Sequence, residues 1–330
     1  MTSSPSVCSS VAKSPPSYEP YRFELSDKFR QLALEELRED DDIRQQSLTQ
    51  MREWIAKHPY IRKCRTDAPF LLRFLRFRKF SVPQAQEALE RYLALRQTFP
   101  EWFQKLDPRD SVMRIPIKDE VFTVLGRDEV GRTVVFIRYG LFDAEKLTPM
   151  AMFRYTMMFI EVLLDNEEVQ IGGFRVWVDY TESVMKHYGM WGIGDLKLLM
   201  DAVNKTMPIR IREIQGAKLP KFAITIANLL LSFASSKLRD RVVCHNTVLE
   251  SKKYFDQTLW PKQYGGPHDT TEKAKELEQL LEEKRDRILA LDDLEIDIEH
   301  YKSLWGQANQ NPNSDIDGGI AGCFRKLNVD

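Results

Sequence analysis

A change of hydrophobic period near Pro108 is the feature of this sequence that most constrains its fold. Before Pro108, apolar residues recur at helical spacing, whereas β-branched runs alternate with helical segments after it. The strand-like runs are 121–125, 133–139, 174–180, 210–215 and 241–245, and the helical segments among them include 150–164, 195–205 and 221–236. The connection 126–131 predicts a hairpin. We therefore expect an α/β fold in which helices cover a mixed sheet.

The part of the chain before Pro108 predicts a helical bundle. Ser26 and Ser81 stand at expected helix starts, with Gln84 at capping-box spacing from Ser81, and Pro59 ends a helix between them. We expect a disordered lead-in over 1–20, a helical module over 21–108 and an α/β domain over 109–268. The remaining 269–330 predict one polar helix over 271–291, an acidic stretch and a flexible tail.

The composition excludes several classes of protein. Among 330 residues, 48 are basic and 49 acidic, and this balance gives no reason to expect a nucleic-acid partner. The four cysteines are widely separated and form no C-x-x-C pair, which predicts free thiols in the cytoplasm. The most apolar stretch, 222–234, is shorter than the roughly 20 residues that span a bilayer. We therefore expect a cytoplasmic protein without a membrane span.

The segment 219–238 is apolar around nearly its whole helical circumference. Such a helix is either buried in the core on several sides or meets lipid. The ends of this segment carry Lys218, Lys221, Lys237 and Arg239, which are unusual flanks for a core helix. An apolar face framed by cations is typical of proteins that sit on anionic bilayers. The cations favour the second interpretation.

The near-zero net charge hides an asymmetry along the chain. Residues 205–241 contain eight basic and two acidic side chains, whereas 269–300 contain five basic and 12 acidic ones. Arg210 and Arg212 are two positions apart on an expected strand, so they share a face, and Lys237 and Arg241 lie four apart near a helix end. This concentration of cations indicates an anionic partner.

Signatures of catalysis are missing from the sequence. It contains no G-x-S-x-G, H-E-x-x-H or phosphate-binding G-x-x-x-x-G-K-[ST] motif, and its five histidines lack metal-ligand spacing. Asp179 ends an apolar strand, where it is either a catalytic acid or, as we prefer, a cap for the following turn. We expect neither a metal nor enzymatic activity.

Five motifs then occur in an order that resembles the CRAL-TRIO (Sec14-like) lipid-binding family. They are 67–80 (DAPFLLRFLRFRKF), Gly131-Arg132, 172–179 (GGFRVWVD), 207–212 (MPIRIR) and 264–266 (YGG). The likeness covers about 23–267. It is closest to the branch that contains the α-tocopherol transfer protein, cellular retinaldehyde-binding protein and the clavesins. The resemblance implies a helical module followed by a lipid-binding α/β cage, with a mobile gate helix that matches 218–241.

The resemblance also implies site residues. The positions that would line the lipid pocket, each equally compatible with core packing, are Phe153, Thr156, Ile160, Phe174, Val178, Leu199, Ala202, Val203, Met207, Ile209, Ile214 and Leu230. Phosphoinositide phosphates would be bound by Arg210, Arg212, Lys237 and Arg241, although Leu231 replaces a further basic position of the family. Phe222, Ile226, Leu229 and Phe233 would face a membrane from the outer side of the gate. Arg73, Arg76 and Arg78 are expected to fix the helical module through ion pairs.

These expectations combine into gated lipid exchange by a monomer. The gate would close over a hydrophobic ligand in water and open at an anionic membrane. A retinoid, tocopherol, carotenoid or sterol-like guest is compatible with the apolar pocket, in which Thr156 is the one polar position. Two alternatives stay open: a trafficking adaptor whose lipid occupancy regulates a partner at 269–330, and a lipid-modifying enzyme.

Overall fold

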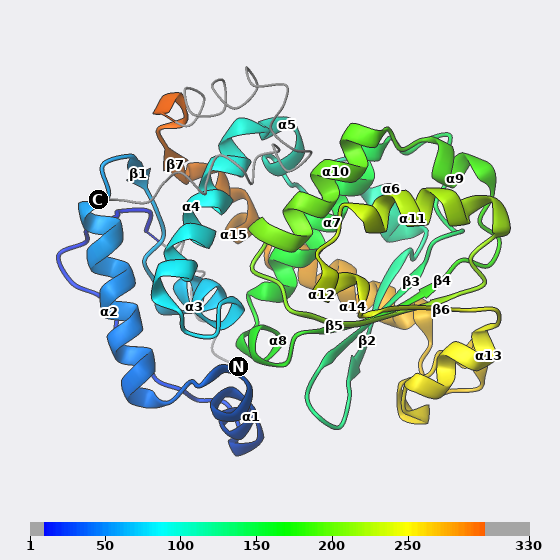
Figure 1. Cartoon of the computed structure of the whole chain (residues 1–330), viewed down its shortest axis with the longest axis horizontal. Helices are drawn as coiled ribbons and strands as arrows, with labels where there is room; N and C mark the ends of the chain where they lie inside the picture. Colours follow the sequence, from blue (N-terminus) through cyan, green and yellow to red (C-terminus); the bar gives the residue numbers. More distant parts are fainter. Residues whose placement is uncertain (1–9, 301–330) are drawn as a thin grey trace.

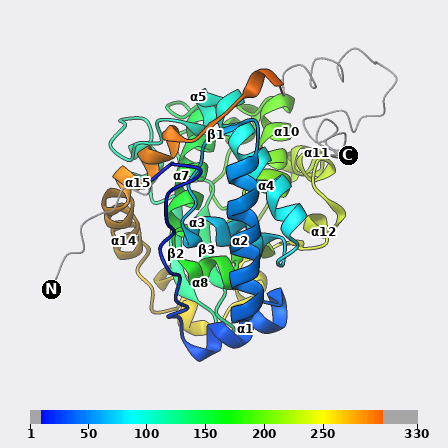
Figure 2. The ribbon, with the colours of Figure 1, turned by 90° about the vertical axis from the view of Figure 1, so that its left-hand side faces the viewer.

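The amino-terminal module is built from helices with apolar inner faces. The structure, a computed structural model, describes residues 10–300. The module's main helices are α1 (Asp27–Leu37), α2 (Asp41–Lys57), α3 (Ala68–Phe77) and α4 (Val82–Thr98), followed by the short α5 (Pro100–Phe103). Figure 2 shows this module from its own side, with α2 in front. The predicted helical bundle is therefore present.

The caps of these helices differ partly from the prediction. Asp40 and Asp67 begin α2 and α3, and their carboxylates accept hydrogen bonds from the amides of Ile43 (2.7 Å) and Phe70 (3.2 Å). Ser26 and Ser81 are the residues before α1 and α4, but neither side chain makes a capping hydrogen bond. The capping box predicted at Ser81 is therefore wrong. Pro83 contributes to this because it removes one of the amides that such a cap normally binds.

A mixed sheet forms the centre of the second part of the chain. In order across the sheet, its strands are β2 (Phe122–Arg127), β3 (Thr133–Arg138), β4 (Phe174–Asp179), β5 (Ile211–Ala217) and β6 (Val242–His245). The first two are antiparallel, as the predicted hairpin requires, and the others pair in parallel. Parallel neighbours need crossover connections, which here contain helices. The predicted α/β fold with a mixed sheet is confirmed.

Side chains alternate between the two covered faces of this sheet. On one face, Phe174 packs in a large core with the buried residues of α7 (Pro149–Leu164). On the other face, Trp177 stacks on Phe255 with ring centroids 4.8 Å apart and donates its indole N–H to Ser251 Oγ (2.9 Å). Figure 1 shows α7, α10 (Ile193–Asp201) and α11 (Ile224–Ser232) on the first side and α13 (Val248–Ser251) on the second.

Two helices predicted as continuous are interrupted. The segment 221–236 contains a 3₁₀ turn η2 (Lys221–Ala223), α11 and a separate α12 (Ser236–Arg239). Ser235 is extended and its hydroxyl accepts from Leu238 N (3.3 Å), so a new helix begins there. The predicted helix 271–291 is divided at Lys284 into α14 (Thr270–Glu283) and α15 (Arg285–Leu289).

The other short elements connect these parts. They are β1 (Ile61–Lys63), α6 (Arg114–Lys118), α8 (Glu167–Gly172), α9 (Met185–Gly189), the π turn η1 (Ala202–Thr206), the 3₁₀ turns η3 (Lys252–Tyr254), η4 (Gln257–Leu259), η5 (Lys262–Tyr264) and η6 (Ala290–Asp293), and β7 (Glu295–Ile296). Strands β1 and β7 pair antiparallel and join the carboxy-terminal part to the helical module. Neither is long enough to give a sequence signal.

The predicted lead-in and tail are only partly described. Residues 1–9 and 301–330 lie outside the described residues. Residues 10–20 contain no helix or strand, yet they make specific contacts with the helical module. The carbonyl of Val11 accepts from Cys64 N (3.0 Å), and the Arg52 guanidinium lies over the Tyr18 ring, 4.4 Å from its centroid.

Gly172 and Gly173 allow the backbones of three segments to meet beside α8. A Cβ atom at Gly172 would collide with the carbonyl oxygen of Gly131, and one at Gly173 with the carbonyl oxygen of Arg210. Gly173 also has a φ of 76°, a conformation that glycine adopts readily. The Gly-Gly pair of the sequence motif is therefore explained by close packing at the start of β4.

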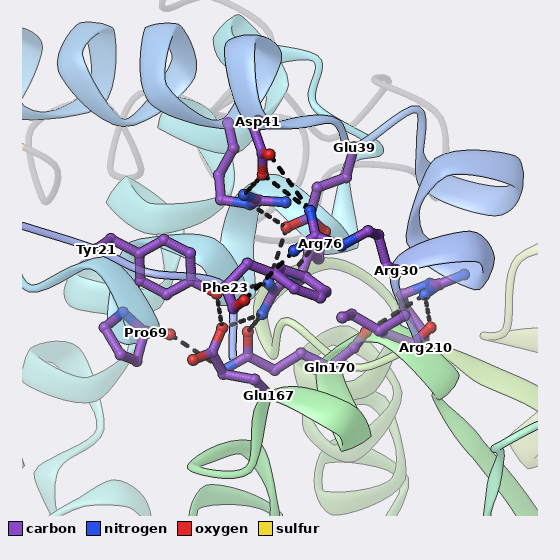
Figure 3. A network of polar contacts seen from close by, with 12 residues as sticks. Tyr21, Phe23, Arg30, Glu39, Asp41, Pro69, Arg76, Glu167, Gln170 and Arg210 are labelled. Carbon is purple, nitrogen blue, oxygen red and sulfur yellow. Dashed lines mark hydrogen bonds and ion pairs between the residues drawn. The ribbon is translucent and has the colours of Figure 1, made fainter. Parts of the chain in front are cut away.

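Arg76 of α3 joins the helical module to the second part of the chain (Figure 3). Its side chain is fully buried and donates to both carboxylate oxygens of Glu39 (2.8 and 2.9 Å), to Glu167 (2.8 Å) and to Gln170 Oε1 (2.8 Å). Arg73 pairs in the same manner with Glu161 (2.9 Å) and with Asp165 of the turn after α7. The predicted ion-pairing role is confirmed for Arg73 and Arg76.

Replacement of Arg76 by methionine is expected to lower the free energy of unfolding by about 3–5 kcal/mol, because it leaves buried Glu39 without its main partner. Urea denaturation followed by circular dichroism measures this loss. Arg30→Met is the control, since Arg30 pairs with Asp41 at the exposed surface and should cost less than about 1 kcal/mol. Equal losses in the two variants would contradict a special role for Arg76.

Candidate functional site

Helix α11 lies over the sheet without being enclosed by the protein. It belongs to the connection from β5 to β6 and packs beside α10 (Figure 1). Although its sequence ITIANLLLS is strongly apolar, none of its residues, all of which are described, is buried. By contrast, most residues of α7 are buried. The interpretation of 219–238 as a central core helix is therefore wrong.

The apolar side chains between α10, α11 and β5 are only partly buried. Leu199, Ile211, Ile214 and Leu230 all contact a small cluster formed by Met200, Ala234 and Leu238, yet each keeps part of its surface accessible. Side chains in a filled interior are close-packed and fully buried. The side chains beneath α11 therefore keep apolar surface that the protein does not cover.

The residues predicted to line a lipid pocket fall into two groups. Seven are buried in the core: Phe153, Ile160, Phe174, Val178, Ala202, Met207 and Ile209. Five are half-buried: Thr156, Leu199, Val203, Ile214 and Leu230. The second group is the part of the predicted set with accessible surface, and four of its members adjoin the cluster beneath α11.

The hydroxyl hydrogen of Thr156, the polar member of the predicted set, is already engaged in a hydrogen bond. Its hydroxyl donates to the carbonyl oxygen of Met152 one turn earlier in α7 (2.8 Å). The oxygen keeps a lone pair for a further hydrogen bond. In this rotamer Thr156 can accept from a hydroxyl group, but it cannot donate to a carbonyl group.

The predicted outer face of the gate is not the most exposed face of α11. Ile226, Leu229 and Phe233 are half-buried, and Phe233 packs against the cluster below the helix. Phe222 is exposed (41%), as predicted, and Ile224, which the sequence did not single out, is exposed as well (45%). The register differs because Phe222 lies in the 3₁₀ turn before α11, so i, i+4 spacing from it does not define one α-helical face.

A basic pocket lies beside the end of α11, between the helical module and the sheet. It has a volume of about 340 Å³ and brings together all four predicted anion-binding residues, Arg210, Arg212, Lys237 and Arg241. The same pocket is lined by Arg78 and Lys79, which follow α3, and by the polar Asn204 and Ser235. The sequence predicted only that Arg78 fixes the helical module, and it did not predict that Arg78 lines this pocket.

The cationic side chains of this pocket outnumber the carboxylates that pair with them. Burial, followed by the neighbouring Arg241 and Arg76, lowers the pKa of Arg210 to about 10. Burial and then Arg241 likewise lower the pKa of Arg212, and burial with Arg241 and Lys79 lowers that of Lys237. Like charges disfavour each other's charged form. A bound anion would reduce this repulsion between the cations, and a multiply charged anion would reduce it more.

The six cations are not equally available to an anion. Arg210 donates to the carbonyl oxygens of Gln170 and Ile171 and pairs with Glu36 of α1 (2.9 Å). Arg241 donates to the carbonyl oxygen of Ile211. Within residues 10–300, no carboxylate forms an ion pair with Lys79 or Lys237. The pocket therefore combines hydrogen-bonded guanidinium groups with ammonium groups that no described carboxylate pairs with.

Sequence reasoning missed Lys79, Asn204 and Ser235 because they come from three separate elements. Lys79 has a left-handed backbone (φ 50°) directly after α3, which turns the chain at the edge of the pocket. Asn204 lies in the π turn that ends α10, a type of helix distortion often found at functional sites. The one available signal was the run Arg76, Arg78 and Lys79 within a single motif.

Asp179 serves as a turn cap and not as an isolated acid. Its Oδ1 accepts from the amide and hydroxyl of Thr181 (2.9 and 2.5 Å), and its Oδ2 accepts from the Tyr264 hydroxyl. The preferred structural interpretation is therefore confirmed.

The part of the chain that the structure describes contains no group of three His, Cys, Asp or Glu residues placed to hold a metal ion. No helix in the same part has the length and apolarity to span a bilayer.

Comparison with known proteins agrees with this architecture. Residues 117–266 match the family model "CRAL/TRIO domain", and residues 40–113 match "Pinta-like, UBA domain". The chain is 28% identical to Clavesin-1 of Xenopus laevis over 239 residues (71% of this chain, 72% of that one) and 26% identical to human Clavesin-2 over 282 residues (84% of each). The crystal structure of Sfh5 aligns with a TM-score of 0.44 at 12% identity, over 80% of this chain and 98% of that one.

The fold and the matched family model define a CRAL-TRIO domain built on a mixed α/β sheet. Residues 117–266 therefore form a CRAL/TRIO domain, and the resemblance found in the motifs is confirmed. At the level of the family, the activity is the binding and transfer of lipids, and the bound molecules are small and hydrophobic.

The amides of 228–232 in α11 are expected to exchange with deuterium faster than those of 153–164 in α7. Fewer buried contacts hold α11 in place, so local opening costs less free energy there. Hydrogen exchange of the purified protein, followed by mass spectrometry of its peptides, measures the difference. Equal protection of the two helices would show that α11 is as firmly fixed as the core.

Proposed function

We propose that this protein carries a single hydrophobic molecule and exchanges it with anionic membranes through displacement of α11. One observation carries the proposal: α11 is apolar, yet no residue of it is buried, and the side chains beneath it are only partly buried. A hydrophobic guest would cover the accessible apolar surface of these side chains. Each Å² of apolar surface removed from water would contribute about 25 cal/mol to closure.

A membrane offers α11 a second apolar environment. Phe222 and Ile224 are exposed at the start of the gate and would reach lipid first. The half-buried Ile226, Leu229 and Phe233 would follow once the helix is displaced. Because the closed and membrane-bound positions both remove apolar surface from water, the helix can change between two states of similar free energy.

Phosphoinositides would direct this exchange to the appropriate membrane. The basic pocket includes Lys237 of α12, which follows α11 directly, so a headgroup bound there would hold the gate close to the bilayer. Guanidinium and ammonium groups are favourable donors to phosphate oxygens. Each cation near an anionic surface contributes on the order of 1 kcal/mol. The protein would thus work in the cytoplasm and meet membranes transiently.

The proposed activity includes no chemical change in the guest. Asp179, the one acid that the sequence offers for catalysis, is occupied by Thr181 and Tyr264. We therefore propose a carrier and not an enzyme. The chemical class of the guest is set by an apolar lining with the Thr156 oxygen as an acceptor, which suits a lipid with a hydroxyl group.

Purified protein incubated with a lipid extract is expected to retain close to one hydrophobic molecule per chain. Native mass spectrometry, followed by organic extraction and chromatography, gives the stoichiometry and identity of that molecule. The recovered molecule should be unchanged when compared with the extract that was supplied. A protein that stays empty with every extract, or that returns a modified lipid, would contradict the proposal.

Lys237→Gln combined with Arg241→Gln is expected to weaken binding to phosphoinositide vesicles by about tenfold or more, because two cations leave the pocket. Lipid retention in the absence of vesicles should be nearly unchanged. Arg210 is a less suitable probe because its guanidinium also holds the end of α8. Vesicle co-sedimentation at constant ionic strength measures the change.

The matched control is Arg62→Gln combined with Lys63→Gln, which removes the same two charge types from two exposed positions of strand β1. This control should bind vesicles like the unmodified protein. Equal weakening in both double variants would mean that net charge, and not the pocket, determines docking.

A further inference from the structure

Glu36 of α1 places a carboxylate against the cations of the basic pocket. It pairs with Arg210 (2.9 Å) and with Arg212, and its other oxygen lies 4.0 Å from Arg132. Helix α1 is held against α8 by Phe29, Leu32, Ala33 and Leu37, which cluster with Ile171. Glu36 is therefore fixed in position by the packing of its helix.

The two arginines differ in how strongly they depend on Glu36. Arg210 keeps two carbonyl partners from α8 and would stay in place without the carboxylate. For Arg212, Glu36 is the one carboxylate that forms an ion pair within residues 10–300, and the Nε and Nη2 atoms of Arg212 are buried without a hydrogen bond. Arg212 is thus the group that can turn from Glu36 toward an anion in the pocket.

An anion that recruits Arg212 must compete with a carboxylate that is already present. A headgroup with one negative charge offers Arg212 no more than Glu36 does, and Glu36 also repels it. A phosphomonoester carries about −1.5 to −2 charges and three acceptor oxygens, so it can outcompete a single carboxylate. Lys79, Lys237 and Arg241 would bind its remaining oxygens.

We propose that Glu36 sets the minimum charge of the anion that the pocket accepts, an inference that rests on the proposed function. It acts as a built-in competitor that rejects singly charged headgroups such as phosphatidylserine and admits headgroups with phosphomonoesters. Glu36 is then a specificity-determining residue supplied by the helical module to a pocket shared with the α/β domain.

The test compares Glu36→Gln with Glu35→Gln, which removes the same charge from the adjacent position of α1. Glu35 is exposed and bonds only to Gln31 of its own helix among the described residues, so it is a matched control. Binding is measured on phosphatidylcholine vesicles that contain phosphatidylinositol bisphosphate or, at equal surface charge, phosphatidylserine. Soluble inositol polyphosphate, titrated by calorimetry, separates recognition of the phosphates from recognition of the bilayer.

Glu36→Gln is expected to increase affinity for phosphatidylserine vesicles by about tenfold, so that a singly charged headgroup is accepted, and affinity for bisphosphate vesicles by at least as much, because Glu36 competes with and repels both anions. Glu35→Gln should leave both affinities unchanged, and Glu36→Asp, which keeps the charge, should largely preserve the low affinity for phosphatidylserine. Equal affinity for phosphatidylserine vesicles in Glu36→Gln and Glu35→Gln would overturn the proposal. Weaker binding of both vesicles by Glu36→Gln would also overturn it, because Glu36 would then orient the arginines for the ligand.

Failure of the proposed function gives a different result. In that case the unmodified protein would bind neither the bisphosphate vesicles nor soluble inositol polyphosphate, and Lys237→Gln with Arg241→Gln would change nothing. If the unmodified protein binds both probes while the two glutamine variants remain alike, only the role of Glu36 is wrong.

Discussion

The buried ion pairs of Arg76 fix the position on which the rest of the molecule depends. Arg76 extends from α3 to Glu39 before α2 and to Glu167 and Gln170 of α8, so one guanidinium joins three segments. Phe77, Arg78 and Lys79 follow directly and line the basic pocket. The pocket has one wall from each part of the chain, and its shape therefore depends on this junction.

The junction also explains why a costly buried charge is used here. Desolvation of a guanidinium is unfavourable, and it is tolerated because several carboxylate and amide oxygens surround Arg76. A hydrophobic contact could bury similar area, but it would allow the helical module to rotate or slide. Directional hydrogen bonds define both the distance and the orientation of Arg78 and Lys79 relative to β5.

Helix α11 differs from this junction, since it is strongly apolar but is held by few buried contacts. Because the junction is rigid and α11 is weakly held, α11 can be displaced from the lipid site while the adjacent headgroup site keeps its shape.

The sequence alone determined the class of fold and much of the chemistry. Hydrophobic periods of two and 3.6 residues predicted the strands of the mixed sheet and the helices of the module, because these patterns depend on local geometry. The clustered cations around an apolar segment indicated an anionic, lipid-related partner, and the family resemblance of the motifs predicted four of the cations that line the pocket. The capping box at Ser81 and the continuity of 221–236 were wrong, because each depends on the backbone direction at one or two residues such as Pro83 and Ser235. On the predicted outer face of the gate, Phe222 is exposed, whereas Ile226, Leu229 and Phe233 are half-buried.

Tertiary structure decided which distant residues meet. No pattern along the chain could place Glu36 against Arg210 and Arg212, or Lys79 beside Lys237, because these pairs lie on different elements and come together only when α1 and α3 dock on α8 beside the sheet. It also decided that α11 is half-covered and not buried, since hydrophobicity shows that a helix avoids water but not which surface covers it. Composition and period are local properties, whereas the balance of charge in a pocket depends on the three-dimensional arrangement.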